Sequence, residues 1–217
     1  DITVDSSASL RPPLKILPLV KPVFLAREKA EVRLLNVLDR KSLRFSLTHA
    51  SGQKFIPTLQ METIGEETIL HIDPPRSFIP GKYTVNIMDS KGRSIQQDFL
   101  WGVLAINTNK SIYSPQDKVK LAMAVLDEQG RMVCDAKVNL KIQSEKADVD
   151  DELSTEKGTI KVNPECQKKG YTLTPDYEAS YKVGKEGKYH LTLTAQTQNG
   201  SYTISDLFEV RDEVPFD

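Results

Sequence analysis

Residues 107–130 read NTNKSIYSPQDKVKLAMAVLDEQG, and their pattern is the clearest indication of the fold class. From residue 118 to residue 125, apolar side chains alternate with polar or small ones. Because successive side chains of a strand point to opposite faces, this period of two predicts a strand with one buried face and one solvated face. Pro115 and its polar neighbours predict a turn before that strand, since the φ angle of proline is fixed.

Short apolar runs separated by turn residues recur on both sides of this stretch, and almost no segment has a helical period. The clearest strand-length runs are residues 33–37, 45–47, 68–72, 83–87 and 138–142. Strands that are buried on one face are typical of antiparallel sheets packed face to face. The sequence therefore predicts an all-β protein built from antiparallel β-sandwiches.

An internal repeat indicates that two such sandwiches follow each other. PGKYTVNI, with Tyr83, recurs as EGKYHLTL, with Tyr189. Each copy runs on to a turn glycine and, six residues later, to an aspartate before an apolar pair; these residues are Gly92 and Asp98 in the first copy and Gly200 and Asp206 in the second. Both copies are typical of the last hairpin of an immunoglobulin-like sandwich, with Gly-Lys-Tyr opening the penultimate strand as a tyrosine corner does.

The repeat sets the expected domain boundaries. Residues 1–22 are rich in proline and are expected to form an extended leader whose apolar residues could pack along a sheet edge. Residues 23–102 are expected to form the first sandwich and residues 103–217 the second. The seam then falls near Trp101 with almost no linker, which predicts a stiff pair of domains.

Thr108 to Val119 resembles the start of the second macroglobulin-like domain of the alpha-macroglobulin family, and the resemblance extends over about residues 103–217. The family pattern there is Thr-Asp-Lys, two residues, Tyr, one residue and Pro-Gly, followed by a strand. Asn109 stands in place of the family's aspartate, and Gln116 stands in place of its glycine, so the turn lacks a residue that adopts positive φ freely.

The resemblance implies a β-sandwich module of a large extracellular or cell-surface protein. The thioester motif of the family, Cys-Gly-Glu-Gln, is absent. Proteinase trapping is therefore not carried over. The C-terminal FEVRDEVPFD is similar to a strand that passes into a further domain, as in the tandem modules of very large bacterial surface proteins.

The two cysteines, Cys134 and Cys166, lie 32 positions apart in the expected second sandwich. They have neither Cys-x-x-Cys spacing nor a nearby histidine, so a zinc or redox site is not indicated. A disulfide between them is the favoured interpretation, and two free structural thiols are the alternative. The bond would stabilise the fold by roughly 3–4 kcal/mol and indicate an oxidising compartment.

The acidic run 147–152 places oxygen ligands at alternate positions, which could suit calcium. The EF-hand pattern fails there, because its glycine position is Leu153 and its bidentate glutamate position is Thr159. The run 144–157 is interpreted as a solvated, mobile acidic loop, with an irregular calcium site at Asp148–Glu152 left open. His49, His71 and His190 have no catalytic neighbour at motif spacing and are expected at the surface or on sheet edges.

Composition excludes several classes of function. With 29 basic and 30 acidic residues the formal charge is −1, so no nucleic-acid partner is expected. No apolar run approaches the roughly 18 residues of a membrane span, so no membrane insertion is expected.

Motifs for a nucleophilic serine, a phosphate loop or a zinc protease are missing, which predicts a non-enzyme without a cofactor or metal. Glycosylation at the sequons of Asn109 and Asn199 is left open.

The leading functional hypothesis is a structural or interaction module of a larger secreted or cell-surface protein. It would act as a rigid spacer or adhesion scaffold, with neighbouring domains of the parent chain as partners. One alternative is a carbohydrate- or protein-binding module that uses the seam around Trp101 and Tyr113 as an aromatic surface. Another is a fragment of a proteinase-trapping macroglobulin. Burial of Trp101 would favour the spacer, and exposure would favour binding.

Overall fold

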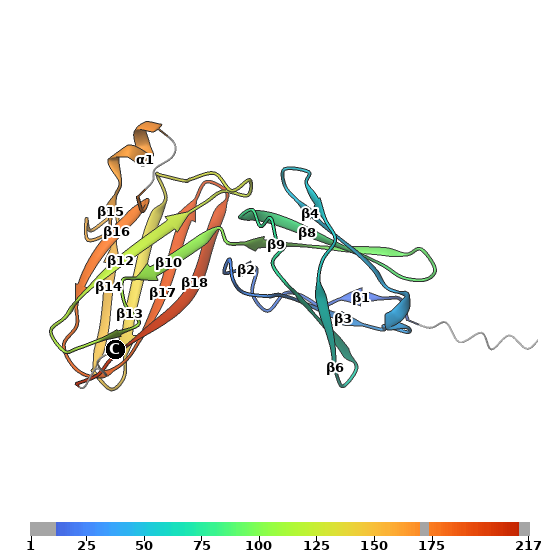
Figure 1. Cartoon of the computed structure of the whole chain (residues 1–217), viewed down its shortest axis with the longest axis horizontal. Coiled ribbons are helices and arrows are strands. Elements are labelled where there is room, and N and C mark those ends of the chain that lie inside the picture. The colour runs from blue at the N-terminus through green and yellow to red at the C-terminus, as the bar shows by residue number, and fades with distance from the viewer. Residues whose placement is uncertain (1–11, 170–173, 213–217) are drawn as a thin grey trace, which may run out of the picture.

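The computed structural model describes residues 12–169 and 174–212 and shows two β-sandwiches that follow each other along the long axis (Figure 1). The first sandwich contains β1 (Lys15–Ile16), β2 (Val23–Phe24), β3 (Ala30–Leu35), β4 (Arg44–His49), β5 (Lys54–Phe55), β6 (Leu59–Ile64), β7 (Glu67–Ile72), β8 (Gly81–Met88), β9 (Ser94–Trp101) and the 3-10 turn η1 (Arg40–Ser42). The second contains β10 (Leu104–Thr108), β11 (Ile112–Tyr113), β12 (Lys118–Val125), β13 (Lys137–Ser144), β14 (Val149–Ser154), β15 (Lys161–Val162), β16 (Tyr177–Lys182), β17 (Gly187–Thr197), β18 (Gly200–Val210) and the helix α1 (Pro164–Lys169).

The two sandwiches have the same strand order. The sheets of the first are β1-β3-β7-β6 and β2-β9-β8-β4-β5, and those of the second are β10-β12-β16-β15 and β11-β18-β17-β13-β14. Each strand of the first sandwich thus has a counterpart nine strands later, in the same place of the equivalent sheet. The protein is all-β and consists of two consecutive immunoglobulin-like antiparallel sandwiches, as predicted.

Each sandwich buries its own apolar faces, and the alternation read from the sequence is the alternation of burial. In β12 the buried positions are Val119, Leu121, Met123 and Val125. One buried cluster is centred on Val32, Leu47, Leu70 and Val85, and the other on Leu121, Leu140 and Leu193. The strands predicted at 45–47, 68–72, 83–87 and 138–142 are present as β4, β7, β8 and β13, and the one predicted at 33–37 is present as β3, which ends at Leu35.

The described part of the predicted leader, residues 12–22, belongs to the first sandwich. β1 pairs with β3, with Lys15 opposite Leu35, and Leu14 is buried in the first core. The apolar residues of this part thus pack along a sheet edge, and the first sandwich begins before residue 23, where its start was predicted. Residues 1–11 lie outside the described residues.

Both Gly-Lys-Tyr segments form tyrosine corners. The hydroxyl of Tyr83 donates to the carbonyl of Ile79 at 2.7 Å, and that of Tyr189 donates to the carbonyl of Lys185 at 2.8 Å. The sequence repeat matched Asp98 with Asp206, and the strand register shifts this match by one residue. Tyr83 lies opposite Phe99 and Tyr189 opposite Phe208, so the aromatic residues correspond and the two aspartates do not.

The acidic run is a strand and not a mobile loop. β14 pairs with β13 over its whole length, with Asp151 opposite Ile142. The Tyr181 hydroxyl of the facing sheet donates to the Asp151 carboxylate at 2.6 Å, and the Asn139 amide donates to the Glu152 carboxylate at 2.6 Å. These hydrogen bonds stabilise the carboxylates of a strand that the sequence analysis had interpreted as a loop because of its acidic residues.

The turn before β12 adopts positive φ without glycine, since Gln116 has φ 73°. A side chain in the left-handed region costs about 1–2 kcal/mol, whereas glycine there costs only about 0.5–1 kcal/mol in chain entropy. We expect Gln116→Gly to stabilise the second sandwich by about 0.5–1 kcal/mol, measured as a shift of its urea midpoint. The matched control is Arg27→Gly at the equivalent turn position, where φ is not positive; that change should destabilise the first sandwich. Destabilisation by Gln116→Gly would contradict the strain argument.

The junction between the sandwiches as candidate functional site

The chain passes from one sandwich to the next through Gly102 and Val103 alone. Gly102 has φ 69°, and its N–H donates to the carbonyl of Phe24 at 2.8 Å. A Cβ at this position would lie 3.0 Å from the Phe78 ring and 3.3 Å from the Cβ of Ala26. The crossing therefore requires glycine, both for its φ and for its size.

The hydrophobic core of the second sandwich continues into the first. Val23 and Leu100 belong to strands of the first sandwich, yet they pack in the second buried cluster together with Val103 and Leu104. The partly buried Leu25 packs against the same cluster. Separating the two sandwiches would expose these side chains, which favours one fixed arrangement.

The connection from β12 to β13 contains a five-residue turn, Asp127–Arg131, which we call the docking turn. The Asp127 carboxylate accepts the backbone N–H groups of Gln129 and Arg131 at 2.9 Å each and the Arg131 Nε–H at 2.8 Å. Burial alone would raise the pKa of Asp127, but these hydrogen bonds and the Arg131 charge outweigh it and hold the pKa below its usual value. The carboxylate thus stays ionised and keeps the turn rigid at neutral pH.

The docking turn lies against the end of the first sandwich. The Lys82 N–H donates to the carbonyl of Glu128 at 2.7 Å, and the Lys82 ammonium lies 3.6 Å from the Glu128 carboxylate. Two glycines make this approach feasible. A Cβ on Gly81 would lie 2.4 Å from the carbonyl oxygen of Glu128, and a Cβ on Gly130 would lie 2.4 Å from that of Pro80.

His49 forms a hydrogen bond to Pro80, the residue against which Gly130 of the docking turn lies. Its Nδ1 accepts the backbone N–H of Ser51 at 3.1 Å, which leaves the proton on Nε2 to donate to the Pro80 carbonyl at 3.1 Å. The ring is 5.1 Å from that of Tyr83, and the residue is 1% exposed. The prediction of a surface or edge position was wrong for His49, because it continues the inward face of β4 after Leu47. His190 is exposed as predicted, and His71 is half-buried beside Glu62.

The structure does not bring Trp101 and Tyr113 together as an aromatic surface. Trp101 is fully buried in the first core, where its indole N–H donates to the carbonyl of Glu28 at 3.0 Å. Tyr113 is 1% exposed in the second core and packs edge-on against Phe208 at 5.3 Å. Trp101 lies next to the junction, whereas Tyr113 pairs with Val210 at the opposite end of the second sandwich, and neither side chain is available to a ligand. This corrects the expected binding seam.

The predicted disulfide between Cys134 and Cys166 is present, with 5.6 Å between the Cα atoms. It joins the segment that follows the docking turn to α1, a helix that the sequence did not indicate. Cys166 is buried, and Cys134 is half-buried. The bond therefore fixes α1 and the start of β13 to each other.

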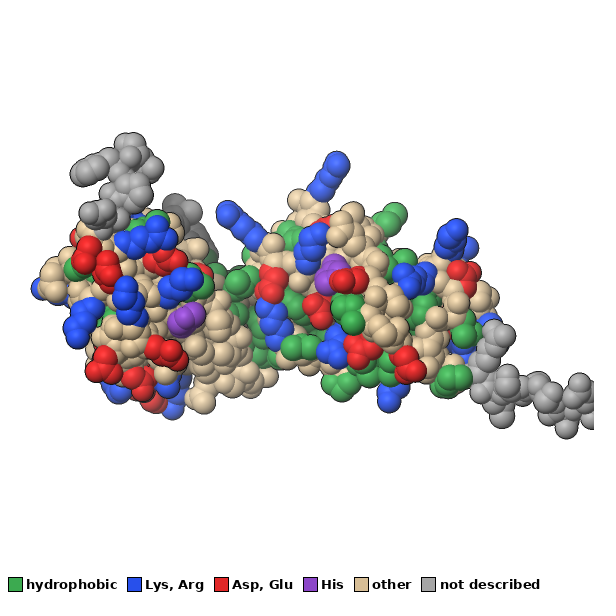
Figure 2. Space-filling view, turned by 90° about the horizontal axis from the view of Figure 1, so that it is seen from below, with side chains coloured by type: hydrophobic (Ala, Val, Ile, Leu, Met, Phe, Trp, Pro, Cys, Tyr) green, Lys and Arg blue, Asp and Glu red, His purple; other side chains and the backbone are tan. Residues whose placement is uncertain are grey.

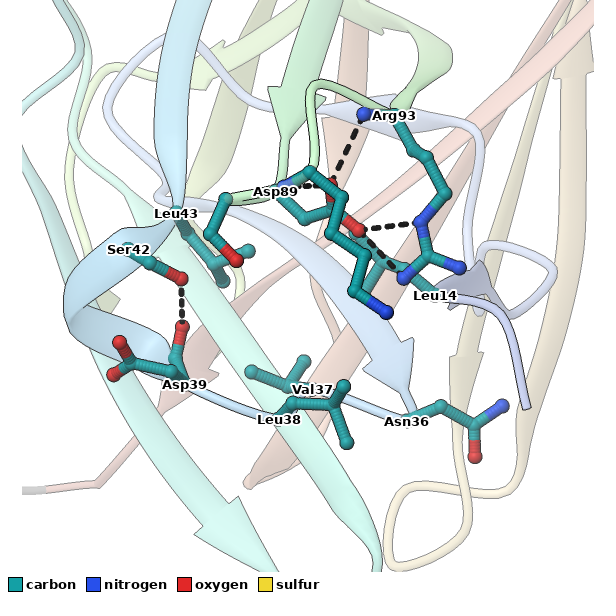
Figure 3. A pocket seen from close by; sticks show the side chains of 11 residues that line it. Leu14, Asn36, Val37, Leu38, Asp39, Ser42, Leu43, Asp89 and Arg93 are labelled. Carbon is teal, nitrogen blue, oxygen red and sulfur yellow. Dashed lines mark hydrogen bonds and ion pairs between the residues drawn. The ribbon is translucent and has the colours of Figure 1, made fainter. Parts of the chain in front are cut away.

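The cavities of the described residues do not form an enclosed ligand site. A pocket of about 20 Å³, large enough for about one water molecule, lies between η1 and the Asp89–Arg93 ion pair at the far end of the first sandwich (Figure 3). An open groove of about 900 Å³ on the second sandwich is lined mainly by polar side chains, including Asn107, Lys118, Lys120, Lys161 and Ser180. No aromatic residue lines that groove. Charged side chains of both signs are interspersed over the surface in Figure 2.

Within residues 12–169 and 174–212, no three His, Cys, Asp or Glu side chains are grouped so that they could hold a metal ion. None of the helices in this part of the chain has the length and apolar character of a membrane span.

One buried carboxylate of the second sandwich lacks a full set of partners. Asp176 is 3% exposed and its Oδ2 has no hydrogen-bond partner, and burial raises its pKa despite a hydrogen bond to the Val125 backbone. A raised pKa in the folded state means that ionised Asp176 opposes folding at neutral pH and that this cost is lost as the pH falls through the folded pKa.

We therefore expect Asp176→Asn to raise the melting temperature at pH 7. The gain should shrink below the raised pKa and vanish near the unfolded value of about 3.9. Thermal melts of both proteins from pH 7 to pH 3.5 measure this difference. A lower melting temperature of the variant at every pH would show that the amide is tolerated less well than the carboxylate.

No protein-family model matches the sequence, and no curated protein matches it either. Among solved structures, the chain is similar to Salmonella alpha-2-macroglobulin, at 10% identity and TM-score 0.34 over 92% of this chain and 15% of that one. It is similar to a tetra-tandem repeat from the extending region of a large adhesion protein, at 14% identity and TM-score 0.35 over 87% and 46%. It is also similar to the Escherichia coli adhesin FdeC, at 12% identity and TM-score 0.32 over 92% and 63%.

The chain thus spans less than two thirds of each of these three proteins. Because all three TM-scores are below 0.5, the fold assignment rests on the chain itself. The shared strand order and the two tyrosine corners identify both halves as immunoglobulin-like sandwiches.

Proposed function

We infer that the chain is a rigid, non-enzymatic spacer module of a larger secreted or cell-surface protein. The observation that carries this proposal is the junction. Two residues connect the sandwiches, the second core includes Val23 and Leu100 of the first, and the docking turn is hydrogen-bonded to Lys82. Each of these contacts opposes bending, and together they fix the distance between the parts that the module separates.

Two further observations fit an extracellular spacer. The Cys134–Cys166 disulfide is of a kind that persists in oxidising compartments. The groove of about 900 Å³ on the second sandwich is open and no described aromatic residue lines it, whereas small-molecule sites are usually lined by hydrophobic and aromatic side chains. The partners would accordingly be the neighbouring domains of the parent chain, and a role as an adhesion scaffold would depend on what those domains bind.

Rigidity is tested by the distribution of distances between the sandwiches. Spin labels are carried by unnatural amino acids at the exposed positions Lys41 and Glu156, which leaves the disulfide intact. Pulsed electron paramagnetic resonance should give one narrow distribution. The matched control inserts six Gly/Ser residues between Gly102 and Val103 and should give a broad one. A wild-type distribution as broad as that of the control would overturn the spacer proposal.

A further inference from the structure

Among the described residues two strand pairs are parallel, and both join the early part of a sandwich to its last strand. β2 runs parallel to β9, and β11 runs parallel to β18. The other strand pairs formed by the described residues are antiparallel. We call β2–β9 and β11–β18 the clamp pairs.

A parallel pair at the two ends of a domain responds to tension in a particular way. If the chain is pulled from both ends, β2 is drawn toward its N-terminal side and β9 toward its C-terminal side. The strands then slide lengthwise past each other, so all hydrogen bonds between them are loaded together. In an antiparallel hairpin pulled at its open end, the bonds are loaded and broken one after another.

The hydrogen bonds of the two clamp pairs occupy equivalent positions. Beside the bonds within the paired strands, Leu100 N–H donates to Pro22 O at 2.9 Å and Gly102 N–H to Phe24 O at 2.8 Å in the first sandwich. In the second, Glu209 N–H donates to Ser111 O at 3.0 Å and Arg211 N–H to Tyr113 O at 2.9 Å. The same arrangement is therefore built twice from different residues.

Each short clamp strand is also anchored by an aromatic side chain. Phe24 is 2% exposed and packs edge-on against Phe99 at 5.6 Å, and Tyr113 occupies the equivalent place against Phe208. The Tyr113 hydroxyl donates to the Asn109 side chain at 2.8 Å. Withdrawing either strand would pull a buried ring into water, which adds resistance to sliding.

A carboxylate fastens the turn that follows each clamp strand. Glu28 accepts the backbone N–H of Leu25 at 3.0 Å, and Asp117 accepts that of Ser114 at 3.1 Å. The Glu28 carbonyl also accepts the Trp101 indole N–H, so this turn is tied directly to β9. The clamp strands are thus held at their C-terminal ends as well as along their length.

We propose that the chain is a tension-bearing element, with the clamp pairs as the force-resisting contacts of each sandwich; this rests on the spacer function proposed above. The disulfide limits the length of chain that the second sandwich releases when it unfolds under force. Cys134 and Cys166 enclose 32 residue steps, which cannot extend while the bond is intact. At about 3.5 Å per residue, reduction should lengthen the extension released by that sandwich by roughly 11 nm.

Single-molecule force spectroscopy with handles at both termini tests the proposal. Glu209→Pro removes the N–H that donates to Ser111, and Leu207→Pro is the matched control on the same edge of β18, where the N–H donates only to the Asp206 carboxylate. With one of the clamp bonds removed, we expect the unfolding force of the second sandwich to fall by roughly a third in Glu209→Pro and to stay near the wild-type value in Leu207→Pro. Equal losses in the two variants would overturn the proposal.

A second pulling geometry uses the wild-type fold and does not depend on either proline variant. One handle is attached at Lys118, which follows β11, and the other at the C-terminus, so that β11 leaves the path of the force. Because bonds would then break in sequence, the unfolding force should be about half of that measured between the termini. Equal forces in the two geometries would overturn the proposal. Neither force measurement depends on how the two sandwiches are oriented, so failure of this proposal can be distinguished from failure of the spacer proposal.

Discussion

Gly130→Ala should loosen the junction, whereas Gly92→Ala should not. Both glycines occupy the same place in a five-residue Asp-x-x-Gly-Arg turn, with φ 83° and 76°. A Cβ on Gly130 would lie 2.4 Å from the Pro80 carbonyl oxygen, while a Cβ on Gly92 would have nothing within 4 Å. The pair therefore separates the cost of docking from the cost of positive φ.

We expect Gly92→Ala to cost about 1–2 kcal/mol of folding free energy, the strain of an alanine in the left-handed region. Gly130→Ala should cost about 1–3 kcal/mol more, because the docking turn must move away from Pro80 and lose its bond to Lys82. Urea titrations measure the free energies, and the spin-label pair at positions 41 and 156 measures the spread of distances. Identical behaviour of the two variants would mean that the docking turn does not hold the sandwiches together.

Replacing both cysteines, by Cys134→Ala with Cys166→Ala, should destabilise the second sandwich by roughly 3–4 kcal/mol. This follows from the chain entropy released when a loop of 32 residues is no longer closed. The loss should be local, because the disulfide joins α1 to the start of β13 and makes no contact with the first core.

The single tryptophan allows the two sandwiches to be followed separately. Trp101 is buried in the first core, so its fluorescence reports that sandwich, while amide hydrogen exchange in β13 and β17 reports the second. We expect exchange to accelerate in β13 and β17 while the fluorescence transition keeps its midpoint. Reduction of the wild-type protein is the control and should reproduce the double variant. An equal shift of the fluorescence midpoint would show that the sandwiches unfold as one unit.

Local patterns predicted the strands and missed the contacts between distant segments. The alternation at 118–125 and the two Gly-Lys-Tyr segments were sufficient to predict strands and tyrosine corners, because each depends on neighbours in the chain. β14 was missed because its three acidic residues hide a strand whose charges are paired only after folding. β1 was missed because two residues carry too little periodicity to be recognised.

The junction could have been partly anticipated from the sequence. DSKGR at 89–93 and DEQGR at 127–131 share a pattern that predicts two identical turns. Only the folded structure shows that one of them docks on Gly81 while the other remains at the far end. His49 follows Leu47 at a spacing of two, so its burial was also indicated by position. Trp101 ends a strand, and no local signal distinguishes a buried aromatic residue from an exposed one at such a place.

The acidic edge of the second sandwich has a consequence for crowding. β14 ends its sheet and carries Asp150, Asp151 and Glu152 along an otherwise open row of backbone hydrogen-bonding groups. Another β-strand that approached this row would bring its own backbone against three carboxylates. If many copies of the protein stand side by side on one surface, this edge keeps neighbouring molecules from fusing their sheets, so that dense arrays remain separate, individually extended molecules.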